Sequence, residues 1–193
     1  MSITKISPDV VDFDAGITIS TTDNSDNLTL TSTDADSSFG PNLNFYRNSS
    51  SPADDDLLAQ IDFNGRNDNS QDVLYANIQT QIIDASDGTE DGRFQINTIV
   101  NGTDRNRFLL TPTETVLNDN SIDLDFRVES DNSANALFVE GDTGRVMLGS
   151  NDPGTKAHAN ADNLVIYEAA NAGLTIATGS SNYGSIFFAD GTS

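Results

Sequence analysis

The sequence predicts an all-β protein, and three observations support this. Apolar residues recur with the period of two that is typical of half-buried strands, while the helical period of about 3.6 is almost absent. The apolar runs are separated by clusters of Asn, Asp, Gly and Ser, which are turn-forming residues. Only 36% of the 193 residues are hydrophobic and 7% are aromatic, so one copy of the chain has little material for a thick core.

Residues 23–118 are predicted to form a β-meander module. Two segments, "NLTLTST" around residues 28–30 and "LNFYRN" at 43–48, are strand-like. Turns such as "DASDGTEDG" and "VNGTDRN" follow, and they are dense in residues that accept a positive φ or hydrogen-bond their own backbone. These turns separate the expected strands of a four-stranded antiparallel meander, at 57–66, 73–83, 92–100 and 106–117.

Residues 119–150 are predicted to form a short β-hairpin module. Its strands are expected near 124–129, 136–140 and 145–148, with "GDTG" (141–144) at the tip of the last hairpin. An isolated hairpin of this size is marginal in water. Because each copy offers so few apolar residues, the module is expected to pack against further copies of the chain around a symmetry axis.

The last part of the chain is predicted to be a linker followed by another β module. Residues 151–162, "NDPGTKAHANAD", are polar and contain a Pro-Gly break, which is typical of a linker. Residues 163–193 are expected to begin a further, incomplete β module, with strands near 164–168, 173–177 and 184–188.

Charge and composition disfavour several classes of function. Nine Lys and Arg against 30 Asp and Glu give a formal net charge of -21, and nucleic-acid binding requires clustered positive charge. No run approaches the roughly 18 consecutive apolar residues of a membrane helix, so membrane insertion is not expected. The absence of Cys removes disulfides, thiolate metal sites and cysteine nucleophiles.

Three features are similar to catalytic or metal sites, and each has a simpler explanation. Asp142-Thr143-Gly144 matches the signature of aspartic proteases, but turn chemistry explains the same residues at a hairpin tip. His158, the only histidine, could bind a metal or an anion if copies met on an axis, but a solvent-exposed linker residue is the simpler expectation. Acidic clusters such as Asp54-Asp55-Asp56 do not have the spacing of a calcium loop. We therefore expect no enzymatic activity, no cofactor and no metal site.

Three stretches have sequences specific enough to compare with known proteins: "LLAQIDFNGRN", "FRVESDNSANALFVEGDTGRVMLGS" and "NAGLTIATGSSNYGSIFFADGTS". From about Leu43 onward, the chain resembles the repeated modules of bacteriophage tail fibres and related virion proteins, especially those of phages of marine bacteria. This resemblance implies an elongated homotrimeric fibre in the virion, joined to the tail at its N-terminal end. It also implies that the chain is an N-terminal portion, and that a C-terminal tip outside this sequence binds the host receptor.

Residues 1–22 differ most from these module sequences and are expected to be a less regular virion-attachment segment. Their alternating apolar residues could add a strand to an exposed sheet edge of a phage tail or adaptor protein. They could equally begin the trimer's own core, and the sequence favours neither alternative. The candidate anchor residues are Ile3, Ile6, Val10, Val11, Phe13, Ile17 and Ile19.

The trimer core is expected where apolar strand faces of three copies meet on a shared axis. Stability would then come from association and would depend on protomer concentration. A register slip of one residue exchanges the two faces of a strand, so alternation alone does not fix which residues point inward. The candidate core residues are Leu124, Phe126, Leu137, Val139, Val146, Leu148, Ile186 and Phe188.

The sequence therefore predicts a structural component of a tail fibre, which anchors to the tail and extends a shaft toward the host for adsorption. One alternative is a fibre module that binds or degrades polysaccharide. It would use exposed aromatic residues, here Tyr46, Tyr75, Tyr167 and Tyr183, and degradation would also need two carboxylates at a fixed separation. A head fibre or capsid decoration protein built from the same modules is a further alternative.

Overall fold

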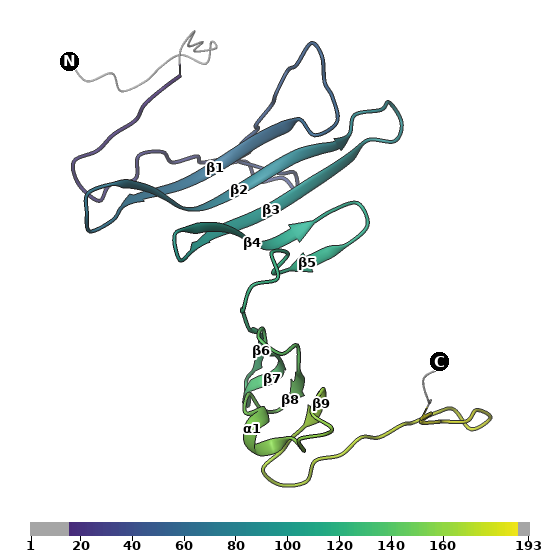
Figure 1. Ribbon diagram of the computed structural model, residues 1–193. Coiled ribbons are helices and arrows are strands. Elements are labelled where there is room, and N and C mark those ends of the chain that lie inside the picture. The colour runs from purple at the N-terminus through teal and green to yellow at the C-terminus, as the bar shows by residue number, and fades with distance from the viewer. Residues whose placement is uncertain (1–15, 189–193) are drawn as a thin grey trace. The chain divides into compact units, whose positions relative to one another are not determined.

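The computed structural model describes residues 16–188 of the chain (Figure 1). The chain divides into two units, Met1–Phe45 and Tyr46–Ser193. All strands of the described residues, and their one short helix, lie in the second unit. The chain is nearly all β and its strands pair antiparallel except for one pair, so the predicted all-β fold class is confirmed.

The first sheet is an antiparallel meander, as expected for residues 57–117. Its strands are hydrogen-bonded in chain order, from β1 to β5. The hairpin connections contain residues with positive φ, for example Asn101 and Gly102 between β3 and β4. The strands are β1 (Leu57–Arg66), β2 (Asp72–Asp84), β3 (Asp91–Val100), β4 (Thr103–Leu110) and β5 (Thr115–Leu117).

The expected strand at 106–117 was wrong, because the chain turns within it. The Thr111 N–H donates to the Glu114 carbonyl oxygen at 2.9 Å, and the Glu114 N–H donates to the Thr111 hydroxyl at 3.1 Å. Pro112 lies in this turn, and a proline has no N–H to donate to a sheet. β5 therefore folds back onto β4, and the meander has a fifth strand.

The second sheet contains the short strands expected after residue 118. β6, β7 and β8 are antiparallel, whereas β9 pairs in parallel with β8. The parallel pairing requires a crossover, and the stretch expected to be a linker supplies it with helix α1 (Pro153–Lys156) and a turn at His158–Ala161. The strands are β6 (Phe126–Ser130), β7 (Ser133–Val139), β8 (Val146–Leu148) and β9 (Leu164–Ile166).

The Gly-Asp-Thr-Gly tip between β7 and β8 is a turn, as expected. The Glu140 N–H donates to the Arg145 carbonyl oxygen at 2.9 Å, and the Gly144 N–H donates to the Glu140 carbonyl oxygen at 2.8 Å. Gly144 has a φ of 71°, in the left-handed region that glycine adopts without a steric penalty. Asp142 is exposed within this turn.

A small core lies on one face of the second sheet. Phe138, Met147 and Val165 are buried and lie side by side on β7, β8 and β9, because these three positions are in register. Ala157 and Tyr167 pack against them. Leu109 is the only other buried hydrophobic residue among the described positions, so this part of the chain buries little apolar surface by itself.

Replacing Met147 by Ala is expected to lower the free energy of unfolding by about 2–4 kcal/mol, because Met147 is 0% exposed and its removal leaves a cavity. Met147→Leu nearly conserves volume and is expected to cost less than about 1.5 kcal/mol. Urea denaturation of both variants at one protein concentration measures the difference. Equal midpoints for the two variants would contradict a packed core at this position.

Four segments that were expected to be strands are not paired as strands in the single chain. They are 28–30, 43–48, 173–177 and 184–188. Alternation makes a segment compatible with a strand, but a strand also needs a neighbour for its N–H and C=O groups. Within residues 16–188 of one copy, these segments have no such neighbour.

Candidate association interface

The face of the second sheet opposite its core carries a continuous group of apolar side chains, with Ser133 and Asn135 at the start of β7. Phe126, Val139, Val146 and Leu164 form one row across four strands, because they are paired in register. The side chains flanking Phe138, Met147 and Val165 along their strands point to this side, because successive side chains alternate. We call these residues the outer face of the second sheet: Phe126, Val128, Leu137, Val139, Val146, Leu148, Leu164 and Ile166.

The outer face of the second sheet remains accessible to solvent. Leu164 is 60% exposed, Val128 is 42% exposed, and Leu137, Val139 and Val146 are half-buried. No charged residue belongs to this face, although the chain carries a net charge of -21. Its lining is therefore suited to contact with another apolar surface.

Most of the candidate core residues from the sequence lie on this face. Five of the eight belong to it, and Leu124 precedes β6 and is half-buried. Ile186 and Phe188 are not brought to it: they lie in the unpaired C-terminal segment and are 60% and 96% exposed. Sequence reasoning missed Val128, Leu164 and Ile166, although the alternation in "FRVES" and the run "LVI" could have indicated them.

The first sheet presents a second apolar face, which sequence reasoning did not identify. Ile61, Ile78, Ile96, Phe108 and Leu117 are paired in register and form one row across all five strands. None of these residues is fully buried, and Leu117 at the edge is 48% exposed. With large apolar neighbours on the same side they form the apolar face of the first sheet: Ile61, Phe63, Ile78, Ile82, Phe94, Ile96, Phe108, Leu110 and Leu117. Thr80, Thr98 and Arg105 lie on the same side, because Thr80 pairs with Phe94 and Thr98 pairs with Arg105.

The opposite face of the first sheet is covered by hydrogen-bonded side-chain amides. The Asn106 Nδ2 donates to Asn97 Oδ1 and the Asn97 Nδ2 donates to Asn77 Oδ1, both at 3.1 Å. These three side chains are buried. A parallel row joins Gln95 to Gln79 at 2.8 Å, and Gln79 continues it to β1. We call these rows the amide ladders. The amide ladders therefore satisfy one face of the sheet with polar contacts, whereas the apolar face remains partly exposed.

A polar pocket of about 240 Å³ lies on the amide side of the first sheet. Asn120 closes part of it, since its Oδ1 accepts from the Asn106 N–H at 2.7 Å. Two buried polar atoms at this site have no hydrogen-bond partner, Nε of Arg93 and Oδ1 of Asn106. The pocket is lined by Arg93, Gln95, Asn97, Asp104, Asn106, Leu109, Asp119 and Asn120.

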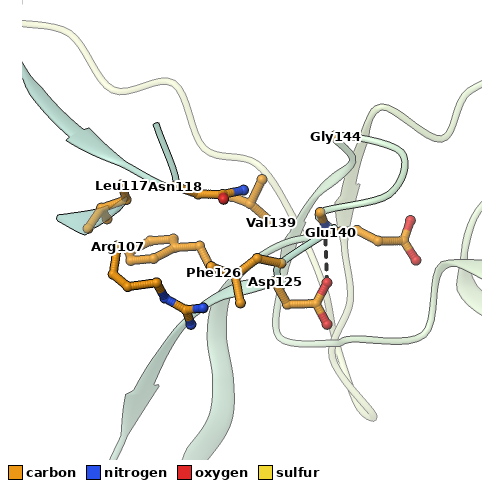
Figure 2. A pocket seen from close by; sticks show the side chains of 10 residues that line it. Arg107, Leu117, Asn118, Asp125, Phe126, Val139, Glu140 and Gly144 are labelled. Carbon is orange, nitrogen blue, oxygen red and sulfur yellow. Dashed lines mark hydrogen bonds between the residues drawn. The ribbon is translucent and has the colours of Figure 1, made fainter. Parts of the chain in front are cut away.

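A second pocket, of about 370 Å³, lies where the chain passes from β5 to β6 (Figure 2). Asp125 accepts a hydrogen bond from the Gly141 N–H at 3.0 Å, which ties this passage to the hairpin tip. A Cβ on Gly141 would lie 2.3 Å from the backbone nitrogen of Leu124, so only glycine fits there. Phe126 and Val139, from the outer face of the second sheet, line this pocket together with Arg107 (Figure 2).

The chemically reactive side chains named from the sequence occupy structural positions. His158 is exposed in the crossover, and its Nδ1 accepts from the Asn160 N–H at 3.2 Å. Asp54 accepts from the Ala85 N–H at 2.9 Å and so holds a connection. Within residues 16–188, no group of three His, Asp or Glu side chains is arranged to hold a metal ion. The same part of the chain contains no helix that could cross a membrane.

The candidate anchor residues fall largely outside the described part of the chain. Ile3, Ile6, Val10, Val11 and Phe13 all precede residue 16. Ile17 and Ile19 are described and are exposed. Tyr46 and Tyr183 are also strongly exposed, whereas Tyr75 is less so and Tyr167 is half-buried; none of the four lines either pocket.

Comparison of the chain with protein-family models, with curated proteins and with solved structures finds no match.

Proposed function

We propose that this chain is a structural component of a bacteriophage tail fibre, in which three copies form an elongated shaft. The observation that carries the proposal is that each sheet presents an apolar face to solvent, while the described residues bury few hydrophobic side chains. The resemblance of its modules to phage fibres supplies the number of copies and the setting in the virion. Its role is to anchor at the tail through residues 1–22 and to extend toward the host surface.

Burial of these faces is large enough to drive association. Fully burying a Val, Leu, Ile or Phe side chain contributes about 1.5–3 kcal/mol. The nine residues of the first sheet's apolar face are only partly buried in one copy, so part of this contribution is still available for association. The total is on the order of 10 kcal/mol per copy, comparable with the roughly 4–15 kcal/mol cost of association. The outer face of the second sheet adds to it.

The charge distribution determines which surfaces of two copies can meet. Each copy carries -21, so surfaces rich in carboxylates repel one another. The central row of the first sheet and the outer face of the second sheet contain no charged side chain. These are therefore the surfaces on which like-charged copies can approach.

Light scattering and denaturation of the full chain test the shared core. A mass near three times 20.6 kDa, with an unfolding midpoint that rises with protein concentration, is expected. A well-folded monomer with a concentration-independent midpoint would contradict the proposed trimeric shaft.

Immunogold labelling of phage particles that carry the chain tests the position in the virion. Label along the tail fibres is expected. Label on the capsid would instead support a head fibre or a decoration protein, and label absent from particles would exclude a virion component.

The polar pocket favours one second candidate function, the binding of a polysaccharide. Its side-chain amides, carboxylates and guanidinium offer paired donors and acceptors to neighbouring hydroxyl groups, and Arg93 Nε and Asn106 Oδ1 have hydrogen-bonding capacity left.

A glycan array with the full chain tests this candidate. If the pocket binds sugar, Arg93→Gln is expected to weaken binding at least about tenfold, since a charge-assisted hydrogen bond contributes about 1.5–3 kcal/mol. Arg66→Gln, at an exposed arginine outside the pocket, serves as the matched control. Binding that survives Arg93→Gln but is lost with Tyr46→Ala or Tyr183→Ala would place the sugar site at the tyrosines. No binding by the unsubstituted chain would contradict the polysaccharide-binding function and leave the structural role in a fibre shaft.

A further inference from the structure

Residues 16–45 have the side-chain pattern of strands but lack the hydrogen bonds of strands. Three segments, 16–20, 27–31 and 42–45, each contain two large apolar residues separated by one polar residue. We call these segments the arms. Within residues 16–45 no backbone N–H donates to a backbone carbonyl oxygen of the same range. The six apolar residues are all between 45% and 61% exposed: Ile17, Ile19, Leu28, Leu30, Leu43 and Phe45.

The connection between the first two arms is held by its own side chains. The Asn27 amide donates to the Ile19 carbonyl oxygen at 3.0 Å and accepts from the Thr21 hydroxyl at 2.9 Å. The Asp23 carboxylate accepts from the Ser25 N–H at 2.9 Å. The conformation of this loop is therefore set locally, whereas the arms that it joins are not paired.

The second connection is organised in the same way. The Asp36 carboxylate accepts from the Ser38 N–H at 2.7 Å, and the Ser32 hydroxyl accepts from the Asp34 N–H at 3.2 Å. At the far end of the loop, a Cβ on Gly40 would lie 3.2 Å from the Ser32 hydroxyl, so the two ends of the loop are close.

Charge is segregated between the arms and the loops. The carboxylates of residues 16–45 are all in the two loops, at Asp23, Asp26, Asp34 and Asp36, and the arms contain no charged residue. Like charges placed opposite one another on neighbouring strands are destabilising. Arms without charge can therefore lie beside identical arms of other copies, while the acidic loops project away.

We propose that the arms of neighbouring copies pair with one another, so that residues 16–45 form a β-structure that exists only between chains. Unpaired N–H and C=O groups on an extended segment are a template for another extended segment. The alternating Ile, Leu and Phe side chains then share one face of each arm, and the Thr and Asn between them take the other. This inference rests on the proposed homotrimer, which supplies the neighbouring arms.

The C-terminal segment repeats this arrangement. Leu174 and Ile176 are exposed and separated by one threonine. The Thr178 hydroxyl donates to the Asn182 carbonyl oxygen at 3.0 Å and closes a loop. A Cβ on Gly184 would lie 2.8 Å from the Ile176 side chain, so the two sides of the loop approach one another without a backbone ladder. The same pairing between copies is expected here.

Hydrogen exchange of the full chain, read by mass spectrometry and paired with light scattering, tests the proposal. In the associated protein, amides of 27–31 are expected to exchange at least about a hundredfold more slowly than an unstructured peptide, because paired strand amides are protected. Dilution below the association range is expected to remove that protection. A trimeric mass with unprotected arms would overturn the arm pairing and leave the shared-core shaft intact, whereas a monomeric mass would overturn both.

A proline substitution supplies a second test. Thr29→Pro removes an N–H from the centre of an arm and is expected to abolish protection of 27–31 and lower the unfolding midpoint of the trimer. Ser37→Pro, in the second loop, is the matched control and is expected to retain both. If Thr29→Pro retains both protection and midpoint, the arms are not paired.

Discussion

Ile96→Glu is expected to convert the associated protein into a 20.6 kDa monomer at micromolar concentrations. Ile96 lies in the middle of the central row of the first sheet, between Ile78 and Phe108. In the proposed trimer, a glutamate there would place a carboxylate from every copy in the shared core, and burying an unpaired carboxylate costs several kcal/mol. Since each 1.4 kcal/mol changes an equilibrium constant tenfold, association is expected to weaken by at least about a thousandfold.

The matched control for Ile96→Glu is Gln95→Glu, which adds the same charge one residue away on the opposite face of β3. Gln95→Glu removes one donor from the amide ladders, at a cost of about 1 kcal/mol, and is expected to retain the trimeric mass. Ile61→Glu separates dissociation from misfolding, because Ile61 is 39% exposed in the single chain and a charged side chain there is expected to leave the fold of one copy intact. Light scattering measures dissociation, and circular dichroism measures misfolding. Trimers from Ile96→Glu and Ile61→Glu would show that this face is not shared.

Gly149→Ala is expected to lower the free energy of unfolding by about 2–5 kcal/mol. Gly149 has a φ of 85°, where a side chain costs about 1–2 kcal/mol. In addition, a Cβ would lie 2.0 Å from the carbonyl oxygen of Tyr167, and relieving such a contact costs roughly 1–3 kcal/mol. Relieving the contact displaces the backbone just after β8 or just after β9. There the Tyr167 N–H donates to the Leu148 carbonyl oxygen at 2.9 Å.

Gly144→Ala separates the two contributions to this loss. Gly144 also has a positive φ, 71°, but a Cβ there meets nothing within 4 Å. Its substitution is expected to cost only the conformational strain, about 1–2 kcal/mol. Urea denaturation at one protein concentration compares the variants. Equal losses would mean that Tyr167 does not approach Gly149 in solution.

The first sheet was largely predictable because alternation and turn residues agree along residues 57–110. The position of Pro112 was the signal for the missed turn before β5. The pairing of β9 with β8 was not predictable in this way, because alternation is local and says nothing about which distant segment lies alongside. The unpaired arms show the same limit: their pattern is compatible with a strand but cannot show whether a partner lies in the same chain.

The two apolar faces could be predicted only in part, because membership of a face depends on register. Asn106 and Phe108 are two residues apart and would share a face in a regular strand. Instead, Asn106 pairs with Asn97 and Phe108 with Ile96, because a bulge at Arg107 shifts the register. One residue thus places Asn106 in the amide ladders and Phe108 on the apolar face. No period-two pattern contains that information.

The strand alignment of the first sheet and the association of copies depend differently on ionic conditions. Asn and Gln side chains carry no charge and do not titrate, so the amide–amide hydrogen bonds that join β2, β3 and β4 do not depend on the ionisation of either partner. Assembly of copies is different, because mutual repulsion of acidic chains weakens as salt screens it. In the proposed trimer, raising the ionic strength is therefore expected to strengthen the contact between copies, while the amide ladders of the first sheet keep their hydrogen bonds.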